Sequence, residues 1–499
     1  MELNILERLS STTNGDALIV PFWHSKKKPE TAYLCKEYEQ ALILPITIKD
    51  FSGKMGETTI VYTTGSGYKR LVLLGLGEKS TCTVEVLRRA YSFAIKIAHA
   101  KSWKHLSVCI PKVRGITLLD TASAVLEGVA LTNYLFLQYK TIDKDKLALV
   151  KRIDLIGTNS AFLPQFENTL SIISAVYLTR DLVNGNADDV TPEFFAKVAC
   201  NLAKKSDRLQ VKILDASELK RLGLHLLLAV GRNSSVGARL LIIEYNGGLK
   251  SVESTLLVGK GVTFDTGGLN LKPSGYIETM RADMAGAGAV LGALQAIDAL
   301  SLPANVVGVI PLTENAVGSK SYKPGDVYSS FNGKSVEIGN TDAEGRLILA
   351  DAISYGQEYC NPTRIIDVAT LTGAIGVALG DLRSGLFSND SALIQLICNA
   401  GDKTGEKVWP FPMDAEYAEL LKSKIADINN CSKGRLAGSI TGAKFLESFL
   451  KQPVAWAHLD IAYTGFMDTP KYYHTSSATG VGVRLLVEII RAIYAKKSQ

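Results

Sequence analysis

Short apolar runs alternate with amphipathic segments along the N-terminal third of the chain, a pattern typical of α/β proteins. Residues 70–78, RLVLLGLGE, predict a buried strand that ends in a glycine turn. Residues 84–100 repeat apolar positions at helical spacing, and further strands are expected at 105–111 and 152–157. We therefore predict a smaller N-terminal α/β domain over residues 1–162.

A long amphipathic segment separates this part of the chain from the rest. Residues 163–185 repeat apolar positions at helical spacing, and we interpret them as a helix that connects two domains. A second helix is expected over 191–206, because Thr191 is a good N-cap and Pro192 suits the first helical position. The chain beyond the connecting helix is expected to form a C-terminal domain over residues 186–499.

In that C-terminal part, predicted strands and helices alternate in a βαβ rhythm. The strands are expected at 209–215, 238–245 and 254–262, and the helices at 285–300 and 346–359. Strands with nearly continuous apolar runs indicate a sheet that helices cover on both faces. The predicted fold class is α/β with two domains, the larger C-terminal one holding a mixed, mainly parallel sheet flanked by helices.

The composition agrees with two folded domains. The chain has 499 residues, 46% of them hydrophobic and 21% charged, which is too long for one ordinary core and typical of a soluble globular protein. No apolar run reaches the roughly 18 to 20 residues that span a bilayer. The N-terminal MELNILERLS lacks the features of a secretory signal. We expect a cytoplasmic protein with no membrane segment.

Cysteine and histidine are not grouped as they would be in a disulfide framework or a thiolate zinc site. The seven cysteines stand singly with no CxxC pair, and the six histidines are dispersed with no HExxH. Such cysteines indicate reduced thiols in a reducing compartment. Any metal site in this chain is therefore expected to use other ligands.

The positive charge is concentrated near the N-terminus. The net charge is +6, and residues 1–165 hold 22 basic and 15 acidic side chains, with HSKKKPE at 24–30 as the densest point. A basic area can bind nucleic acid. No nucleic-acid motif accompanies this one, so a solvated loop is the favoured interpretation.

A glycine turn at residues 75–80, GLGEKS, has some likeness to a phosphate loop. It lacks the GxxxxGK(S/T) spacing of that motif, and glycine is common after a strand. Phosphate binding by this turn alone is therefore disfavoured.

Two acids and a guanidinium lie close together in NTDAEGRLILADA, residues 340–352. Asp342, Glu344 and Arg346 occupy every second position immediately before an apolar run. Holding these charges near a protein interior is costly, because burial disfavours charged groups. Either they lie on a surface turn, or they serve a site that needs oxygen ligands and one fixed positive charge.

A second charged group lies upstream, in residues 258–290. Lys260 interrupts an otherwise apolar predicted strand, which leads Asp265 into a Gly-Gly loop. Lys272 follows in a turn, and Asp283 comes just before a predicted helix of small residues. A charged lysine in a buried strand is costly, so Lys260 must reach solvent, form a salt bridge or serve a site.

Four acids end predicted strands or begin predicted helices of one expected sheet: Asp265, Asp283, Asp342 and Glu344. In open α/β sheets, sites form at the carboxyl ends of the strands. Four unpaired carboxylates would repel one another there. Two divalent cations about 3.5–4 Å apart remove such repulsion in many hydrolases, and a neutral Lys260 amine would then supply a fifth ligand.

Taken together, these motifs resemble the leucine aminopeptidases, a family of dizinc exopeptidases. NTDAEGRLILADA matches the family signature without a gap, and GKGVTFDTGG, LKP and ADM agree with it. DVATLTGA at 367–374, WAHLDIA at 456–462 and SATGVGV at 477–483 agree as well. The resemblance is dense over residues 185–499 and thin before them, although the N-terminal part fits the family's variable, macro-like first domain in length and order.

The resemblance implies a role for each matching position. The metal ligands it implies are Lys260, Asp265, Asp283, Asp342 and Glu344. The two catalytic groups that do not bind metal match Lys272 and Arg346. The positions that line the pocket for the first side chain of the substrate match Met280, Thr370 and Gly373, whose types suit leucine, methionine or another medium apolar residue.

The resemblance also implies the reaction and its cofactors. Two divalent ions per subunit, zinc or manganese with magnesium or cobalt as alternatives, would activate a bridging hydroxide that attacks the scissile carbonyl. One metal would take the free α-amine of a short peptide, so that only N-terminal residues are released. Bicarbonate held by Arg346 would act as an accessory anion that moves the proton.

Two features of the C-terminal motifs stay open from sequence alone. Tyr463 stands where the family usually keeps glycine, and it would reshape the neighbourhood of the site. His458 and Asp460 lie on the same face of a predicted strand and could form a dyad. A structural role is favoured for His458 and Asp460, because the metal site already accounts for catalysis.

Three hypotheses on function follow. The leading one is a cytoplasmic aminopeptidase that trims short peptides as a homohexamer, the hexamer being implied by the resemblance alone. The second is a DNA-binding or regulatory protein, which the basic N-terminal third keeps open. The third is a dinuclear metallohydrolase that acts on another substrate, such as a phosphoester.

Overall fold

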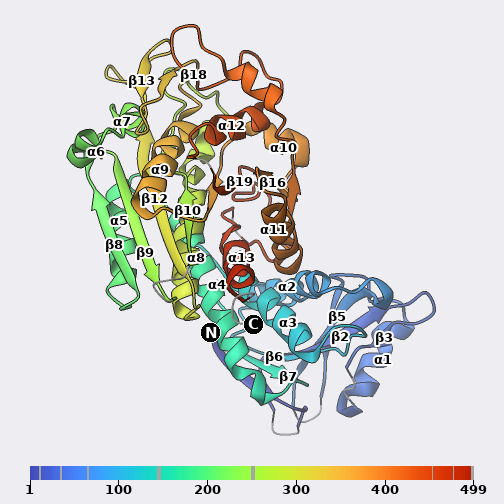
Figure 1. Cartoon of the computed structure of the whole chain (residues 1–499). Coiled ribbons are helices and arrows are strands. Elements are labelled where there is room, and N and C mark those ends of the chain that lie inside the picture. Colours follow the sequence, from blue (N-terminus) through green and yellow to red (C-terminus); the bar gives the residue numbers. More distant parts are fainter. Residues whose placement is uncertain are drawn as a thin grey trace. The chain divides into compact units, whose positions relative to one another are not determined.

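The structure is a computed structural model of the chain (Figure 1). It describes residues 1–10, 13–33, 36–64, 67–142, 148–248, 253–451, 453–475 and 477–495. The chain divides into two compact units. The first unit comprises Met1–Ile173 and Thr469–Ser477, and the second comprises Ser174–Asp468 and Ala478–Gln499. Each unit has an α/β fold, as the sequence predicts.

The first unit contains one sheet and the helices that cover it. Its strands are β1 (Glu2–Leu6), β2 (Ala17–His24), β3 (Glu30–Thr31), β4 (Thr58–Tyr62), β5 (Arg70–Glu78), β6 (His105–Cys109) and β7 (Arg152–Ile156). Its helices are α1 (Glu39–Thr47), α2 (Val84–Ala100) and α3 (Leu118–Thr132), with the short 3-10 helices η1 (Lys36–Tyr38), η2 (Lys79–Thr81) and η4 (Ser160–Phe162). The strand and helix predicted at 70–78 and 84–100 are confirmed as β5 and α2.

The sheet of the first unit is mostly parallel. In the described part of this unit, its strands follow the order β1-β7-β6-β2-β5-β4, with β3 paired to β2. Strands β1, β7, β6, β2 and β5 are mutually parallel, so their carboxyl ends share one edge. Ala17 and Ile19 of β2 pack in the cluster that contains α2 and α3, whereas Leu18 and Val20 pack in a cluster on the other face. Burial of both faces explains the continuous apolar runs.

The second unit begins within α4 (Leu163–Asn184), which corresponds to the predicted connecting helix. Its other helices are α5 (Pro192–Ala203), α6 (Ala216–Leu222), α7 (His225–Gly231), α8 (Ala285–Ala299), α9 (Glu344–Cys360), α10 (Gly373–Leu379), α11 (Ser391–Thr404), α12 (Gly438–Glu447) and α13 (Val483–Ala495), with η5 (Ile277–Ala282) and η6 (Ala415–Leu421). Thr191 caps α5 as predicted, because its side chain accepts a hydrogen bond from the N–H of Phe194.

The strands of the second unit form a large mixed sheet and a small one. They are β8 (Leu209–Leu214), β9 (Arg239–Asn246), β10 (Ser254–Gly259), β11 (Gly261–Asp265), β12 (Asn305–Asn315), β13 (Val327–Ser329), β14 (Ser335–Glu337), β15 (Arg364–Ala369), β16 (Ser384–Ser388), β17 (Val408–Pro410), β18 (Ile428–Asn429) and β19 (Ala455–Asp460). Within the described residues, the large sheet has the order β17-β16-β19-β15-β10-β12-β9-β8, with β11 paired to β12 (Figure 1). The small sheet has the order β13-β14-β18.

The centre of the large sheet is parallel and buried on both faces. Strands β19, β15, β10 and β12 run parallel, while β9 and β8 are added antiparallel at one side. Leu256 and Val258 of β10 pack in a core cluster with residues of α9. A Cβ added at Gly308 of β12 would meet Leu294 of α8, on the opposite face. Helices α8 and α9 therefore cover opposite faces of this central region.

The single strand predicted at 254–262 is wrong, because the chain breaks into β10 and β11 at Lys260. The Lys260 N–H donates to the Val368 carbonyl at 3.0 Å, and the Lys260 carbonyl accepts from the Ala287 N–H at 2.8 Å. Strand β10 pairs with both β12 and β15, whereas β11 pairs with β12 alone. The break places Lys260 between β15 and the start of α8, a tertiary arrangement that a run of apolar residues does not reveal.

Small residues let α8 lie directly on the sheet at this break. A Cβ at Gly286 would lie 2.1 Å from the Val368 carbonyl oxygen, and a Cβ at Gly259 would lie 2.6 Å from the Gly286 carbonyl oxygen. Neither contact is tolerated by a larger side chain without a backbone shift. The close packing brings Asp283, two residues before α8, next to Lys260.

Among the described residues we find no helix whose length and hydropathy would suit a bilayer crossing.

Candidate active site

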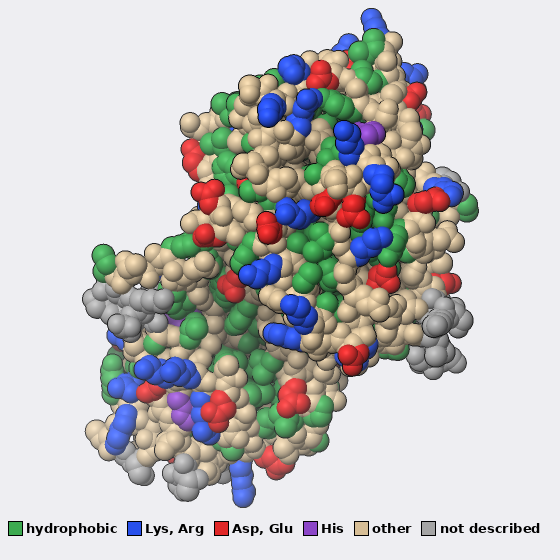
Figure 2. All heavy atoms as spheres, turned by 90° about the vertical axis from the view of Figure 1, so that its left-hand side faces the viewer, with side chains coloured by type: hydrophobic (Ala, Val, Ile, Leu, Met, Phe, Trp, Pro, Cys, Tyr) green, Lys and Arg blue, Asp and Glu red, His purple; other side chains and the backbone are tan. Residues whose placement is uncertain are grey.

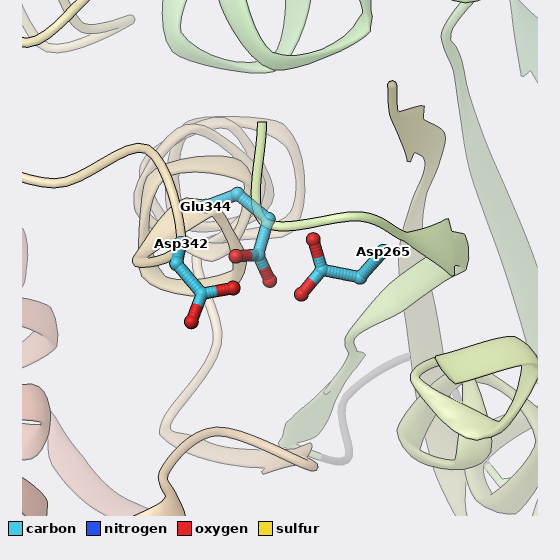
Figure 3. A group of neighbouring side chains, drawn as sticks. All are labelled: Asp265, Asp342 and Glu344. Atoms are coloured by element: carbon cyan, nitrogen blue, oxygen red, sulfur yellow. The ribbon is translucent and has the colours of Figure 1, made fainter. Parts of the chain in front are cut away.

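Three of the predicted acidic residues meet at the carboxyl end of β11 and the amino end of α9 (Figure 3). Asp265 is the last residue of β11, Glu344 is the first residue of α9, and Asp342 precedes it by two residues. Each offers a carboxylate oxygen within 4.8 Å of those of the other two. Figure 3 shows the three carboxylates turned toward a common space. The sequence prediction that these residues converge agrees with this geometry.

Lys260 and Asp283 complete a buried charged network beside these acids. The Lys260 Nζ lies 2.7 Å from Asp283 Oδ1 and 2.9 Å from Glu344 Oε1, and donates to the Thr370 carbonyl at 2.8 Å. The Thr370 hydroxyl donates to Asp283 Oδ1 at 2.8 Å. A Cβ added at Gly345 would lie 2.5 Å from the Lys260 Cε, so glycine is needed there to admit the lysine.

Lys272 approaches the same acids from the loop after β11. Its Nζ lies 2.8 Å from Asp265 Oδ2 and 2.6 Å from Asp342 Oδ1. The Lys272 side chain keeps 15% of its surface exposed, against 3% for Lys260. Lys272 is therefore the member of the pair that solvent or a substrate reaches more easily.

One supporting residue, Asn315, escaped the sequence analysis. Its Nδ2 donates to Asp265 Oδ1 at 2.8 Å and to the Thr341 carbonyl at 3.0 Å. The Gly267 N–H donates to the same Asp265 oxygen at 2.8 Å. Asn315 ends β12, the strand next to β11, so its signal was a polar residue at the carboxyl end of a parallel strand. These two donors fix the orientation of the Asp265 carboxylate through its Oδ1 atom.

The pKa values of Asp265 and Lys260 both lie above their ordinary values, for different physical reasons. Burial and the neighbouring Glu344 charge raise the pKa of Asp265 to about 7, against the lowering effect of Lys272. For Lys260, burial lowers the pKa, but the charges of Asp283 and Glu344 outweigh it and the net shift is upward. Without a bound cation, the lysines therefore carry the positive charge that balances the acids.

The donor set fits divalent cations. Asp283 Oδ2 and Glu344 Oε2 are buried oxygens that have no hydrogen-bond partner among the described residues. A buried carboxylate oxygen without a partner is costly. Carboxylate oxygens are the ligands that hard divalent ions prefer, and a deprotonated lysine amine can add a nitrogen ligand. The residues present are thus suited to hold metal where the lysines now neutralise charge.

Arg346 lies in the first turn of α9 with its guanidinium largely buried. Its Nη1 donates to the Asn430 carbonyl at 2.9 Å, while its Nε has no partner among the described residues. Burial lowers the pKa of the guanidinium, which nevertheless stays charged in proteins. The Nε–H of the Arg346 guanidinium is therefore available to bind an anion.

The three predicted pocket residues differ in their surroundings. Thr370 is buried and belongs to the charged network through the hydrogen bonds above. Gly373 is exposed at the start of α10, and a Cβ added there would meet nothing within 4 Å. Met280 is half-buried in η5, three residues before Asp283. Of the three, Thr370 alone shows a side-chain hydrogen bond to the network within the described part of the chain.

The dyad of His458 with Asp460 is not formed. The His458 Nδ1 lies 2.5 Å from Asp367 Oδ1, and the Trp456 Nε1 donates to Asp367 Oδ2 at 2.8 Å. Asp460 instead accepts a hydrogen bond from the Thr372 hydroxyl at 2.6 Å. Both side chains are buried and bonded to neighbouring protein groups, which supports a structural role for them.

Tyr463 packs against the helix that carries Gly373. A Cβ added at Gly376 of α10 would lie 2.3 Å from the Tyr463 ring, and Tyr463 keeps 39% of its surface exposed. The tyrosine therefore rests on α10, where the family usually has no side chain.

The fold and the site define a two-domain α/β protein with a candidate metal site of clustered carboxylates at the carboxyl ends of parallel strands. Residues 177–487 match the model described as "Cytosol aminopeptidase family, catalytic domain", and residues 19–143 match "Cytosol aminopeptidase family, N-terminal domain". The chain therefore belongs to the cytosol aminopeptidase family and is an aminopeptidase. The resemblance and the fold class stated from the sequence are confirmed.

Individual relatives are similar over nearly the whole chain. The "Probable cytosol aminopeptidase" of Protochlamydia amoebophila is 41% identical over 500 residues, which is 100% of both chains. That of Chlamydia abortus is 43% identical over 493 residues, which is 98% of both. Among solved structures, a mutant of tomato leucine aminopeptidase has a TM-score of 0.88 at 31% identity, covering 98% of this chain and 96% of that one.

A further similar solved structure is a complex with manganese. "Bottromycin maturation enzyme BotP in complex with Mn" has a TM-score of 0.85 at 31% identity, covering 96% of this chain and 99% of that one. The similarity to both structures extends over the two units.

Proposed function

We propose that this aminopeptidase uses two divalent metal ions to release N-terminal residues, with leucine and other medium apolar residues preferred. The observation that carries the proposal is that three carboxylates converge and that Lys260 joins Asp283 to them, with unpartnered buried oxygens on Asp283 and Glu344. The candidate ligands are Lys260, Asp265, Asp283, Asp342 and Glu344. Zinc or manganese is proposed, with magnesium or cobalt as alternatives, and the manganese complex of BotP supports this choice.

Bound cations would supply Lewis acidity and lower the pKa of water for attack on the scissile carbonyl. The protein's own residues would then position the substrate. Lys272, with its ammonium more exposed than that of Lys260, would donate to the carbonyl oxygen and stabilise the negative charge that develops on it. Burial of Asp265 and Glu344 around this position excludes water and strengthens that interaction.

Arg346 would hold bicarbonate as an accessory anion. Its Nε lacks a partner among the described residues, and its planar fork suits a planar oxyanion. No described histidine contacts the carboxylates of the site, so an anion on Arg346 would carry the proton from water to the departing amine. Bicarbonate is the anion that the family resemblance suggests.

The substrate preference rests on the pocket residues Met280, Thr370 and Gly373. The open space at Gly373 leaves room for a medium apolar side chain, and half-buried Met280 offers an adaptable apolar wall. Tyr463, packed on α10, would narrow the approach to this pocket. We propose short peptides with a free N-terminus as substrates, a homohexamer as the working assembly and the cytoplasm as its location.

We do not propose DNA binding for this chain. Lys26, Lys27 and Lys28 are exposed in the connection between β2 and β3, as a solvated turn would place them. On the face shown in Figure 2, basic and acidic side chains are interspersed and form no continuous basic area.

The metal affinity is expected to rise with pH. Without a cation, Lys260 holds its proton, and Asp265, with a pKa of about 7, holds one below that pH. Below pH 7, a cation must displace the protons of both Lys260 and Asp265. Above pH 7, Asp265 has mostly lost its proton, and the cation displaces mainly that of Lys260. Calorimetric titration of the metal-free protein with Zn²⁺ in two buffers of different ionisation enthalpy should therefore show more protons released at about pH 6 than at about pH 8. An affinity that does not change with pH would contradict Lys260 as a ligand.

Arg346→Ala is expected to lower kcat by about 100-fold, at the lower end of the usual contribution of proton transfer. Added bicarbonate should restore part of the lost activity if the arginine only holds the anion. Arg435→Ala removes an exposed arginine from the loop that follows Asn430, serves as the control and should leave kcat unchanged. Thermal unfolding of both variants checks the fold, and an Arg346 variant with full activity in bicarbonate-free buffer would remove the assigned role.

The function is tested by comparing hydrolysis of leucine-p-nitroanilide with that of its N-acetylated form. We expect cleavage of the free amine alone, loss of activity with a chelator, and recovery with Zn²⁺ or Mn²⁺. A parallel assay with p-nitrophenyl phosphate tests the phosphoester alternative. If the metal-loaded protein cleaves the acetylated amide equally well, the exopeptidase assignment fails.

A further inference from the structure

The N-terminal unit contains a cavity of its own, of about 740 Å³. It lies where the parallel strands of the first sheet end. Among its lining residues, Glu7 follows β1, Ile110 follows β6, Gly157 follows β7, Lys79 follows β5 and Trp23 is the penultimate residue of β2. Ligands of open α/β sheets bind at this edge, and the volume is within the range of small-molecule sites.

Positive groups lie around this cavity. Lys79 and Lys112 both line it, both are exposed, and neither forms an ion pair within the described residues. Leu118, another lining residue, is the first residue of the 15-residue helix α3. The first intrahelical hydrogen bond of α3 runs from Thr121 N–H to the Thr117 carbonyl, so the N–H of Leu118 comes before it. A helix amino end and two lysines together favour a phosphate group.

Other lining groups suit the uncharged part of a ligand. Thr158 is 3% exposed, and its Oγ1 has no hydrogen-bond partner among the described residues. Trp23 and Tyr33 contribute aromatic rings to the walls. Gly157 has φ +90°, and a Cβ there would lie 2.6 Å from the Tyr33 ring, so glycine lets the ring lie against the backbone. The cavity thus combines rings, hydroxyl-binding groups and positive charge.

We propose that this cavity binds a nucleotide, that is, a phosphorylated molecule carrying a planar ring and sugar hydroxyls. The lysines and the α3 amino end would hold the phosphates, the aromatic rings would contact the base, and Glu7 would accept from a hydroxyl. The turn GLGEKS does not form a phosphate loop, but it contributes Lys79 to the cavity. Lys79 would bind a phosphate there together with residues at the ends of the neighbouring strands. The candidate catalytic residues all belong to the second unit, so the cavity shares no residue with them.

The test is calorimetric titration of the full, metal-loaded protein with ADP, adenosine and inorganic phosphate. ADP should bind saturably in the micromolar range, and more tightly than either of the other two probes. Binding of phosphate alone as tightly as ADP would reduce the site to an anion site and overturn the nucleotide assignment. The absence of saturable ADP binding would overturn the proposal altogether.

Variants place the ligand in the cavity. The double variant Lys79→Gln, Lys112→Gln should weaken ADP binding by about tenfold or more, and Thr158→Val by about fivefold. Lys101→Gln, an exposed lysine of the same unit that does not line the cavity, should bind ADP as the native chain does. Since ADP also binds divalent cations, unchanged affinity in both cavity variants would place it at the metal centre and overturn the proposal. The lysines are at the surface, so their replacement leaves the fold intact.

Discussion

Glu344→Gln is expected to lower kcat/KM by about a thousandfold and to remove metal from the protein. Glu344 is 1% exposed, with Oε1 at 2.9 Å from the Lys260 Nζ and Oε2 without a partner among the described residues. Glutamine keeps the shape of the side chain but removes the charge that a cation would bind. The loss of one anion should also leave the Lys260 ammonium less well balanced.

Elemental analysis and steady-state kinetics measure this effect together. Glu358→Gln provides a matched control, because Glu358 lies on the same helix α9 with its side chain 67% exposed and forms only a surface ion pair with Lys451. The control should keep its metal content and kcat/KM. A Glu344 variant with full metal occupancy would refute its assignment as a ligand.

Lys272→Ala is expected to keep its metal and lose about 100- to 1000-fold in kcat, the usual cost of removing one donor to a developing oxyanion. Its Nζ contacts Asp265 and Asp342 when no cation neutralises them. Cations bound by those acids would release the ammonium toward the substrate carbonyl. The effect should therefore appear in turnover and not in metal content.

The control for this variant is Lys320→Ala, which removes an exposed lysine from the same unit. Its kcat and metal content should equal those of the native protein. Loss of metal from the Lys272 variant would mean that the lysine has a structural role in assembling the acids. Retention of most turnover would contradict its role in catalysis.

Much of the fold could be predicted because it depends on local patterns. The apolar run at 70–78 is β5, and the helical spacing at 84–100 is α2. The N-cap hydrogen bond of Thr191 is a contact over three residues, so sequence spacing alone indicates it. The five candidate metal ligands were also found by their types and motif spacing.

The break at Lys260 shows where local patterns fail. The residues on both sides are apolar, so periodicity predicts one strand. The Lys260 N–H donates the last bond of the β10–β15 ladder to the Val368 carbonyl, whereas its carbonyl turns to the Ala287 N–H of α8, and the chain leaves the β10 pairing there. Both partners are more than 25 residues away in sequence, and neither can be inferred from the spacing of apolar positions.

The sequence by itself determined that there are two α/β domains, where most helices and strands lie and which residues are candidate ligands. The period of hydrophobic positions and the spacing of motifs are local properties of the chain. Tertiary structure alone decided that Asn315 orients Asp265 and that His458 pairs with Asp367 instead of Asp460. It also decided that the strand ends of the first sheet enclose a cavity. The physical reason is that hydrogen bonds and cavities depend on which distant segments become neighbours, and strand order in a sheet is not encoded in the period of any one strand.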